Sequence, residues 1–521
     1  MDRFRQLIGH KVMPDEPIVD SIHRLTAEAV DGRRPAFAEL ADALFAVASD
    51  AELADSALDV LAAAGPKIWI DLDVVLRPGR YGYRDPRITQ PTAVHELSNP
   101  LAVALAACGR NGRERHRAIG HPAMRTDVRL FPVLAIRTAD WAETVQDRAL
   151  RVLGDVLTDA DAAALLAVVP VVARIGDRSR GNRTVETVRD ALRRADDSTL
   201  SIVRGCADLH GRRFVFDVSL EAGRMDPRQL AAASLHESDI ISRTRCAEAL
   251  AARAIDRDQP ELMEELLAGR SARVRVTALT TLVRLGHPRH GARFLDDDAS
   301  MVRLTAQWAV RRAGGDPAEL YRQRLQDAAD RGRRRGLLAG LGDCATSAEA
   351  ALVLPYLRDH SSRVRTEAVR TLRRLDALAD VLDAQGDVVA LLEDPAPVVV
   401  RNVADLLRAS GSKAPAERLW GLLGDADRPR HVRETARRLL ADRDAWTRIK
   451  ADLLLSGDPD ALLSSRASAD LAALCGRDAA YIHQRCPAEL RGELEELLVA
   501  AEDAVGPETT RLLRWLVRSG R

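Results

Sequence analysis

Arginine and tyrosine gather in one short segment of the sequence, Arg-Pro-Gly-Arg-Tyr-Gly-Tyr-Arg-Asp-Pro-Arg at residues 77–87. Guanidinium and phenol groups are enriched at the energetic centres of protein interfaces, and the Pro and Gly residues disfavour a helix here. The chemistry expected of such a loop is therefore recognition of a partner. The predicted partner-binding residues are Arg77, Arg80, Tyr81, Tyr83, Arg84 and Arg87. The alternative is an ordered connection whose tyrosines pack on the rest of the protein.

Two further arginine runs contain groups that could hold phosphate, Arg178, Arg180 and Arg183 in one loop and residues 331–335 in another. Guanidinium forks match phosphate oxygens in pairs. Arginine is nevertheless the default basic residue of this chain, and acidic residues lie near both runs, so a solvated surface is the preferred interpretation. Aromatic residues make up only 3% of the sequence, too few for the stacking platform of a single-strand binder.

Motifs that would indicate an enzyme are missing from the sequence. It contains no P-loop, GxGxxG, GxSxG or HExxH motif and no Cys-His pairing that would suggest a nucleophile. We therefore predict no catalytic residues, no cofactor and no metal site.

The elements that would position a binding site are segments that repeat a fixed pattern. The pattern is Val-Arg, then Ala four residues after the Val and an aliphatic residue eight after it. One copy consists of Val364-Arg365, Ala368 and Leu372. The pattern also starts at Val145-Gln146, Val274-Arg275, Val302-Arg303, Val400-Arg401 and Val432-Arg433. In the copy at Val400 the aliphatic residue, Leu407, comes one place early.

The spacing of these copies, 28 residues from Arg275 to Arg303 and 32 from Arg401 to Arg433, is typical of stacked helical hairpins. The Val and the later aliphatic residue share a helix stripe, and Ala allows close approach of a partner helix. Capping side chains are expected before these helices at Ser271, Asp298, Ser361 or Ser362, Asp394 and Asp427. We expect the Arg after the Val to reach an Asp of a neighbouring turn, giving a structural ladder of Arg275, Arg303, Arg365, Arg401 and Arg433.

These motifs resemble the HEAT repeat family, and within it the short bacterial repeats of the phycobilisome-lyase type. The resemblance is clear from about Ser238 to Leu440. It implies an all-α fold, a right-handed α-α superhelix (a HEAT/armadillo-like solenoid) with a concave inner face. The family includes scaffolds, lyases, a di-iron hydroxylase and DNA glycosylases, so the resemblance does not fix an activity.

Two of those family activities have partial counterparts here. The hydroxylase uses four His-Glu pairs, whereas this chain has His95-Glu96, His236-Glu237 and an isolated His431 with Glu434. Asp140-Trp141 is similar to the acidic and aromatic residues of the glycosylases, but a helix cap explains Asp140 as well. Neither a metal site nor base excision is predicted.

Composition narrows the choice of partners and compartment. The 77 basic and 77 acidic residues cancel, which removes the simplest argument for a nucleic-acid or membrane partner. Six cysteines without a CxxC motif indicate reduced thiols, and the start of the chain lacks the apolar run of a signal peptide, so we expect a cytoplasmic protein. The excess of Arg over Lys, with abundant Ala, Leu and Val, is typical of a GC-rich bacterial genome.

The repeats divide the chain into four predicted regions. Residues 1–130 form a divergent N-terminal helical cap with an inserted loop at 67–91, which could include a short strand. Divergent HEAT-like repeats follow at 131–235, where residues 211–218 could be a strand or a bulky helix. Regular repeats span 236–441, and 442–521 form a C-terminal helical cap.

The leading hypothesis for function is a non-enzymatic scaffold that binds another protein through its concave face and the N-terminal loop. The alternative is nucleic-acid binding through an Arg-lined groove. The third hypothesis is a cryptic enzyme of the DNA glycosylase or lyase type.

Overall fold

The computed structural model describes residues 16–76, 97–176, 181–327, 332–376, 385–411, 413–478, 482 and 484–518. Across these residues the secondary structure is helical and no β-strand occurs, so the all-α repeat fold expected from the sequence is confirmed. None of the helices in these stretches is both long and apolar enough to cross a lipid bilayer.

The first of two compact units runs from Met1 to Gly269. One hydrophobic cluster of this unit extends from Ile22 to Val218. Its described helices are α2 (Ile18–Val30), α3 (Arg34–Val47), α4 (Ala51–Ala63), α5 (Ile68–Leu76), α6 (Pro100–Ala107), α7 (Gly112–Ile119), α8 (Ala123–Thr126), η1 (Val128–Leu130), α9 (Phe131–Arg137), α10 (Glu143–Val156), α11 (Ala162–Ile175), α12 (Asn182–Arg194), α13 (Asp197–Arg204), α14 (Leu209–Glu221), α15 (Pro227–His236), α16 (Ile240–Arg257), α17 (Glu261–Glu264) and η2 (Glu265–Ala268).

The second unit runs from Arg270 to Arg521. Its core includes a hydrophobic cluster from Leu295 to Ala467 and another from Trp446 to Val517. Its described helices are α18 (Ala272–Arg284), η3 (Pro288–Phe294), α19 (Ser300–Arg312), α20 (Pro317–Gln326), α21 (Arg334–Cys344), η5 (Ser347–Glu349), α22 (Ala350–Val353), η6 (Leu354–Arg358), α23 (Ser362–Arg374), α24 (Gln385–Ala390), η8 (Leu391–Glu393), α25 (Pro397–Ala409), α26 (Ala416–Gly424), α27 (Arg430–Ala441), α28 (Ala445–Ser456), α29 (Ala461–Ala473), η9 (Leu474–Asp478), α30 (Ala488–Ala500), α31 (Glu502–Val505) and α32 (Pro507–Arg518).

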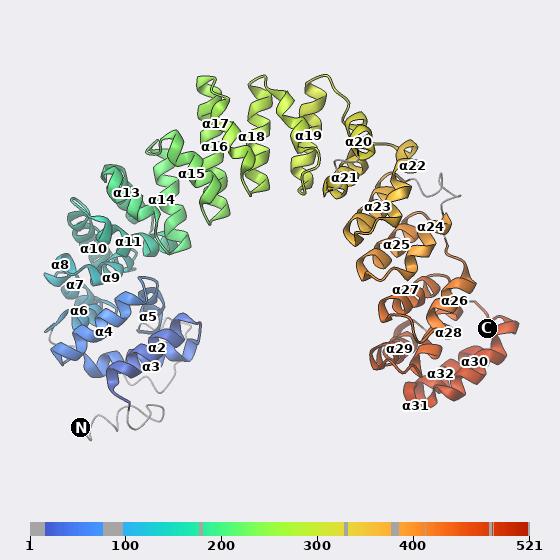
Figure 1. Ribbon diagram of the computed structural model, residues 1–521. Coiled ribbons are helices and arrows are strands. Elements are labelled where there is room, and N and C mark those ends of the chain that lie inside the picture. Colours follow the sequence, from blue (N-terminus) through green and yellow to red (C-terminus); the bar gives the residue numbers. More distant parts are fainter. Residues whose placement is uncertain are drawn as a thin grey trace. The chain divides into compact units, whose positions relative to one another are not determined.

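Within each unit, consecutive helices lie side by side in the order of the chain (Figure 1). Each regular hairpin has a short first helix and a longer second helix, and second helices pack on one another, as α21 does on α23 and α23 on α25. The repeated pattern faces this packing: Val364, Ala368 and Leu372 on α23 are all buried. The stripe therefore forms a core that neighbouring hairpins share, because no hairpin could bury it alone.

The segment expected to be a loop from residue 67 begins instead as helix α5, and residues 77–91 lie outside the described part of the chain. The sequence of α5, IWIDLDVVL, is apolar at most positions, and Ile68, Trp69, Leu72 and even Asp73 are buried. A helix buried on so many sides lacks the alternation of apolar and polar faces that reveals a helix in a sequence. Residues 211–218, left open between strand and helix, belong to α14.

The turns before α19 and α23 are held by a carboxylate that lies one or two residues before the expected cap. Ser271 and Ser361 occupy the N-cap positions of α18 and α23 but make no capping hydrogen bond. Instead Asp359 Oδ1 accepts from the backbone N–H of Ser361 at 2.9 Å. Asp297 does the same for Ala299 at 2.9 Å, in place of the expected Asp298. Asp394 was placed correctly and accepts from Ala396 at 2.8 Å.

Candidate functional site

Arg365 shows how one hairpin is fastened to the next. Its Nε and Nη2 atoms donate to the two carboxylate oxygens of Asp394 at 2.7 and 2.9 Å, while Nη1 donates to the carbonyls of Asp359 and His360. This hydrogen bonding raises the pKa of Arg365 further above its ordinary value. The guanidinium therefore links the turn of its own hairpin to the turn of the following one.

The same fork recurs along both units. Arg275 bonds Asp297, Arg303 bonds Asp343, and Arg433 bonds Asp458. Arg115 forms the same fork with Asp140, and Arg212 and Arg334 each donate one hydrogen bond to an acidic residue, Glu237 and Asp359; the repeated Val-Arg pattern did not indicate these three arginines. These three pairs are each separated by 25 residues, whereas Arg275 and Asp297 are separated by 22 and Arg303 and Asp343 by 40.

Arg401 is a correction to the expected ladder. It is exposed, and no acidic side chain in the described stretches lies within 4 Å of it. The equivalent of Arg365 in this hairpin is Val400, because Asp394 precedes Val400 by the six residues that separate Asp359 from Arg365. Val400 is fully buried. The early position of Leu407 already indicated this shift of one residue.

Asp140 lies at the centre of a buried ion-pair cluster. Its carboxylate accepts from Arg115 at 3.0 and 2.9 Å, from Arg137 at 3.1 Å and from the N–H of Ala142 at 3.0 Å. Burial alone would raise the pKa of Asp140, but these hydrogen bonds and positive charges hold it below its usual range. Both oxygens are occupied, so this carboxylate is a structural tie and is not placed to act as the base of a glycosylase.

The second helices also carry a set of positions outside the buried stripe and the ladder, and we call this set the outward face of α18–α25. It consists of the positions two before, one after and five after each ladder position on α18, α19, α21, α23 and α25. On α19 these positions are Met301, Leu304 and Trp308, whose exposed fractions are 56%, 52% and 38%. Three large apolar side chains exposed on one helix form a patch that water solvates poorly.

Charge on the outward face is strongly biased. It carries five arginines, Arg273, Arg335, Arg363, Arg370 and Arg401, against one acidic residue, Asp405. Arg273 and Arg363, like Arg401, are exposed with no acidic partner among the described residues. The corresponding positions of α10, α14 and α16 in the first unit hold both charges, with Arg151 and Arg213 against Asp147, Asp217 and Glu248. The bias therefore belongs to this part of the chain and not to the repeat itself.

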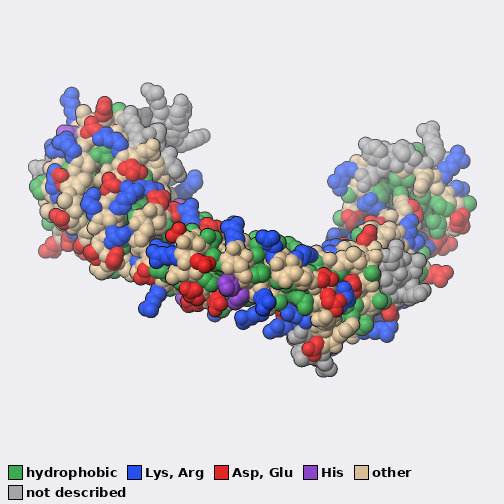
Figure 2. All heavy atoms as spheres, turned by 90° about the horizontal axis from the view of Figure 1, so that it is seen from above, with side chains coloured by type: hydrophobic (Ala, Val, Ile, Leu, Met, Phe, Trp, Pro, Cys, Tyr) green, Lys and Arg blue, Asp and Glu red, His purple; other side chains and the backbone are tan. Residues whose placement is uncertain are grey.

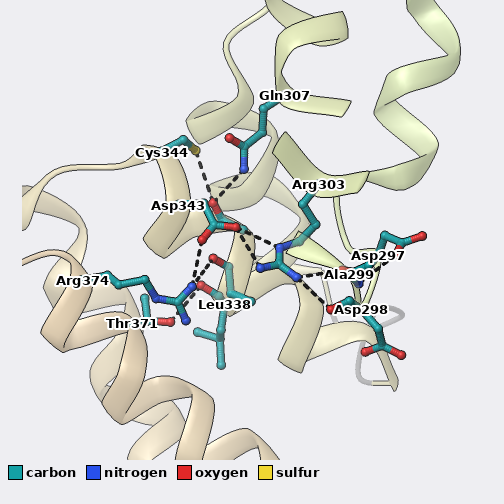
Figure 3. A network of polar contacts seen from close by, with 12 residues as sticks. Asp297, Asp298, Ala299, Arg303, Gln307, Leu338, Asp343, Cys344, Thr371 and Arg374 are labelled. Atoms are coloured by element: carbon teal, nitrogen blue, oxygen red, sulfur yellow. Dashed lines mark hydrogen bonds and ion pairs between the residues drawn. The ribbon is translucent and has the colours of Figure 1, made fainter. Parts of the chain in front are cut away.

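A recess of about 220 Å³ opens between α21 and α23 on this face, and we call it the Gly336 recess. Figure 3 shows the polar network behind it, where Arg303 and Arg374 reach Asp343 from α19 and α23. The Asp343 carboxylate accepts from Arg303 at 3.0 Å and from Arg374 at 2.9 Å. Arg303 and Arg374, which this network holds in place, line the recess together with Arg335 and Arg370.

Charged groups of both signs are interspersed over the surface presented in Figure 2, with hydrophobic side chains between them. The described arginines of the two runs considered as phosphate sites are likewise close to acidic residues. Arg183 pairs with Asp147 at 3.0 Å, Arg333 with Asp296 at 3.4 Å, and Arg335 with Asp298 at 3.3 Å. Arg178, Arg180 and Arg331 of these runs lie outside the described residues.

The remaining predicted sites are placed as follows. The expected recognition loop, Arg77, Arg80, Tyr81, Tyr83, Arg84 and Arg87, lies outside the described residues, as does His95-Glu96. Glu237 bonds Arg212 at 3.0 Å and takes part in the ladder. Within the described stretches no three His, Cys, Asp or Glu side chains are grouped as a metal ion would require.

The stacked hairpins, the shared Val/Ala/Leu stripe and the repeated Arg–Asp fork define the protein as an α-solenoid of HEAT-like repeats. The sequence matches no protein-family model and no curated protein. Among solved structures, the chain is similar to an importin beta crystallised with ammonium sulfate, with 11% identity over 98% of this chain and 67% of that one and a TM-score of 0.33. It is also similar to yeast importin-beta, Kap95p, with 15% identity over 97% and 67% and a TM-score of 0.31. An engineered protein matches with 17% identity over 82% of this chain and 99% of that one, with a TM-score of 0.16.

Proposed function

We propose that the protein is a non-enzymatic scaffold that binds another protein through the outward face of α18–α25, with the loop at residues 77–87 as a second contact. The observation that carries this proposal is the exposure of Met301, Leu304 and Trp308 on one side of α19. Tryptophan is among the residues most enriched at the energetic centres of interfaces. Large apolar side chains that share one exposed helix face are typical of a surface that a partner covers.

Nucleic-acid binding is the competing function, and one observation favours it. Arg273, Arg363 and Arg401 are exposed without acidic partners among the described residues, as phosphate-binding groups would be. Against it, the three apolar side chains of α19 lie on the same face, and apolar patches do not contribute to phosphate binding. Binding to another protein accounts for both the apolar and the charged groups.

The test compares the partners captured by the full chain with those captured by Leu304→Ser/Trp308→Ser. Both side chains are exposed, so their removal should leave helicity and melting temperature nearly unchanged. We expect the variant to lose its specific partner in affinity capture, and the purified pair to stop co-eluting in size-exclusion chromatography.

The matched control is Ile202→Ser/Leu209→Ser, which removes two exposed aliphatic side chains from α13 and α14 in the first unit. This control should capture the partner like the natural sequence. If Leu304→Ser/Trp308→Ser retains the same partner with the same affinity, the outward face is not the binding surface. If binding instead falls steeply with added salt and oligonucleotides compete for it, the nucleic-acid function is favoured.

A further inference from the structure

Gly336, which lines the recess, lies unusually close to the backbone of Asp296. A Cβ atom at Gly336 would lie 2.0 Å from the carbonyl oxygen of Asp296, so only glycine fits there. The recess is lined by Gly336 and Ala339, by four arginines, Arg303, Arg335, Arg370 and Arg374, and by two acidic residues, Asp298 and Glu367. At about 220 Å³ the recess is smaller than the roughly 300–1,000 Å³ of small-molecule sites, and its size suits one side chain or one small ionic group.

The arginines around the recess differ in how fully their donors are used. Arg303 and Arg374 are committed to Asp343, and Arg374 also bonds Glu367. Arg370 instead donates to the neutral side-chain oxygen of Asn402 at 2.9 Å, and its distance to Glu367 is 3.8 Å. A guanidinium carries five N–H donors, so Arg370 keeps donors for an additional acceptor.

Arg335 is the second guanidinium with weak internal ties. Its ion pair with Asp298 spans 3.3 Å, and the Asp298 side chain is 84% exposed. Such an exposed pair contributes little and exchanges readily with another carboxylate. The recess therefore presents two guanidinium groups, Arg335 and Arg370, whose acidic contacts among the described residues are the long ones to Asp298 and Glu367.

The apolar patch and the recess are aligned by the repeat. Leu304 on α19 and Arg335 on α21 both stand one residue after a ladder position. Trp308 on α19, Ala339 on α21 and Arg370 on α23 all stand five residues after one. Because α19 packs on α21 and α21 on α23, a segment that runs across these helices meets apolar side chains first and guanidinium groups next.

We infer that the recess receives a carboxylate from an acidic segment of the bound protein, whose neighbouring apolar residues cover Leu304 and Trp308. This inference rests on the proposed scaffold function and specifies the chemistry of its partner. A carboxylate accepts charge-assisted hydrogen bonds from two guanidinium groups, and positive charge on the surrounding face excludes basic segments. The five arginines of the face, against the single acid, complement a segment of net negative charge.

The experiment selects from a display library of random 16-residue peptides on the immobilised full chain. The enriched peptides should carry several Asp or Glu residues beside Leu, Ile, Phe or Trp. Arg335→Ser/Arg370→Ser should weaken their binding by about tenfold to a hundredfold, because hydrogen bonds to charged groups are the stronger kind. The control Arg289→Ser/Arg293→Ser makes the same charge change at two exposed arginines on η3 and should bind normally.

Charge reversal gives a second measurement that loss of folding cannot imitate. Selection on Arg335→Glu/Arg370→Glu should enrich basic peptides that keep their apolar residues. Peptides that lose binding with Leu304→Ser/Trp308→Ser but not with either arginine variant would overturn this inference and leave the scaffold function standing. Peptides affected by neither pair, or an absence of any enriched peptide, would overturn both. Salt-sensitive binding of a single-stranded oligonucleotide that depends only on the arginines would also overturn both.

Discussion

Replacing Asp140 with Asn should destabilise the first unit by about 3–5 kcal/mol. The carboxylate lies between two fully buried guanidinium groups, those of Arg115 and Arg137; an amide cannot neutralise Arg115, whereas Arg137 keeps its ion pair with Asp73. Removing one partner from a buried ion pair costs this much, because the remaining charge stays buried without compensation. At a urea dependence of about 3 kcal/mol per M, the midpoint of unfolding should fall by at least about 1 M.

The assay is urea unfolding followed by circular dichroism, together with hydrogen exchange of α7, α9 and α10. Exchange is needed because a repeat protein with two compact units need not unfold in one step. The control is Asp55→Asn, which breaks an ion pair of 2.8 Å with Arg129 where the carboxylate is 60% exposed. That change should cost less than about 1 kcal/mol.

The pH dependence of the Asp140→Asn effect gives an independent check. The folded-state pKa of Asp140 is lowered, so the stability it contributes is complete above its unfolded pKa of about 4 and is lost as the pH falls through the folded value. The difference between the natural sequence and the variant should therefore stay constant from pH 5 to pH 8 and shrink only in stronger acid. A cost below about 1 kcal/mol at pH 7 would refute the buried-network interpretation.

Three shorter predictions follow. Ala368→Leu should overpack the shared core and cost about 1–3 kcal/mol, and an unchanged melting curve would show that the repeat pattern is misaligned. Arg365→Ala should cost about 3 kcal/mol because it leaves a buried aspartate unpaired, whereas Arg401→Ala should stay within about 0.5 kcal/mol; equal costs in urea would contradict the correction at Arg401. The double change of Tyr81 and Tyr83 to Ala should weaken partner capture and leave helicity intact, and loss of the cooperative melt would place both rings in the core.

The stripe of the second helices could be predicted because each of its positions is held by packing. Val364, Ala368 and Leu372 recur in type and spacing since a change at any of them would leave a cavity or a clash in the shared core. Cys246, four residues before the buried Leu250 on α16, occupies the small position of this stripe. It is fully buried, and burial raises its pKa to about 12.

The misplaced caps and the missed helix have local causes. A serine directly before a helix is a common N-cap signal, but Asp359 accepts the N–H of Ser361 and also one hydrogen bond from Arg334. A carboxylate with two donors is held more firmly than a hydroxyl with one. Helix α5 was missed because its apolar residues surround the helix and leave no polar face to mark the period.

The outward face was missed because its positions carry no repeated residue type. Leu304, Arg335, Thr366 and Arg401 follow the ladder positions of four successive second helices and share nothing but their place in the repeat. Packing constrains none of the exposed ones, so a search for recurring residues passes over them. They become visible only when the helices are aligned on the Arg–Asp fork and the exposed positions are compared across hairpins.

The hairpin of α25 distinguishes two kinds of arginine position in this chain, the buried ladder position and the exposed position of the outward face. A helix turns by about 100° per residue, so the single step from Val400 to Arg401 moves a side chain from the buried ladder to the solvent. At the ladder position this hairpin has a buried Val in place of the arginine, while Asp394 of its own turn is bound by Arg365 from the preceding hairpin. At the outward position it carries an arginine that forms no ion pair with the described acidic residues, which adds nothing to the fold that the structure shows. Position 400, where an arginine would stabilise the ladder, is a Val, and position 401, where an arginine makes no ion pair among the described residues, is an Arg. This arrangement is expected of a surface that binds an acidic partner.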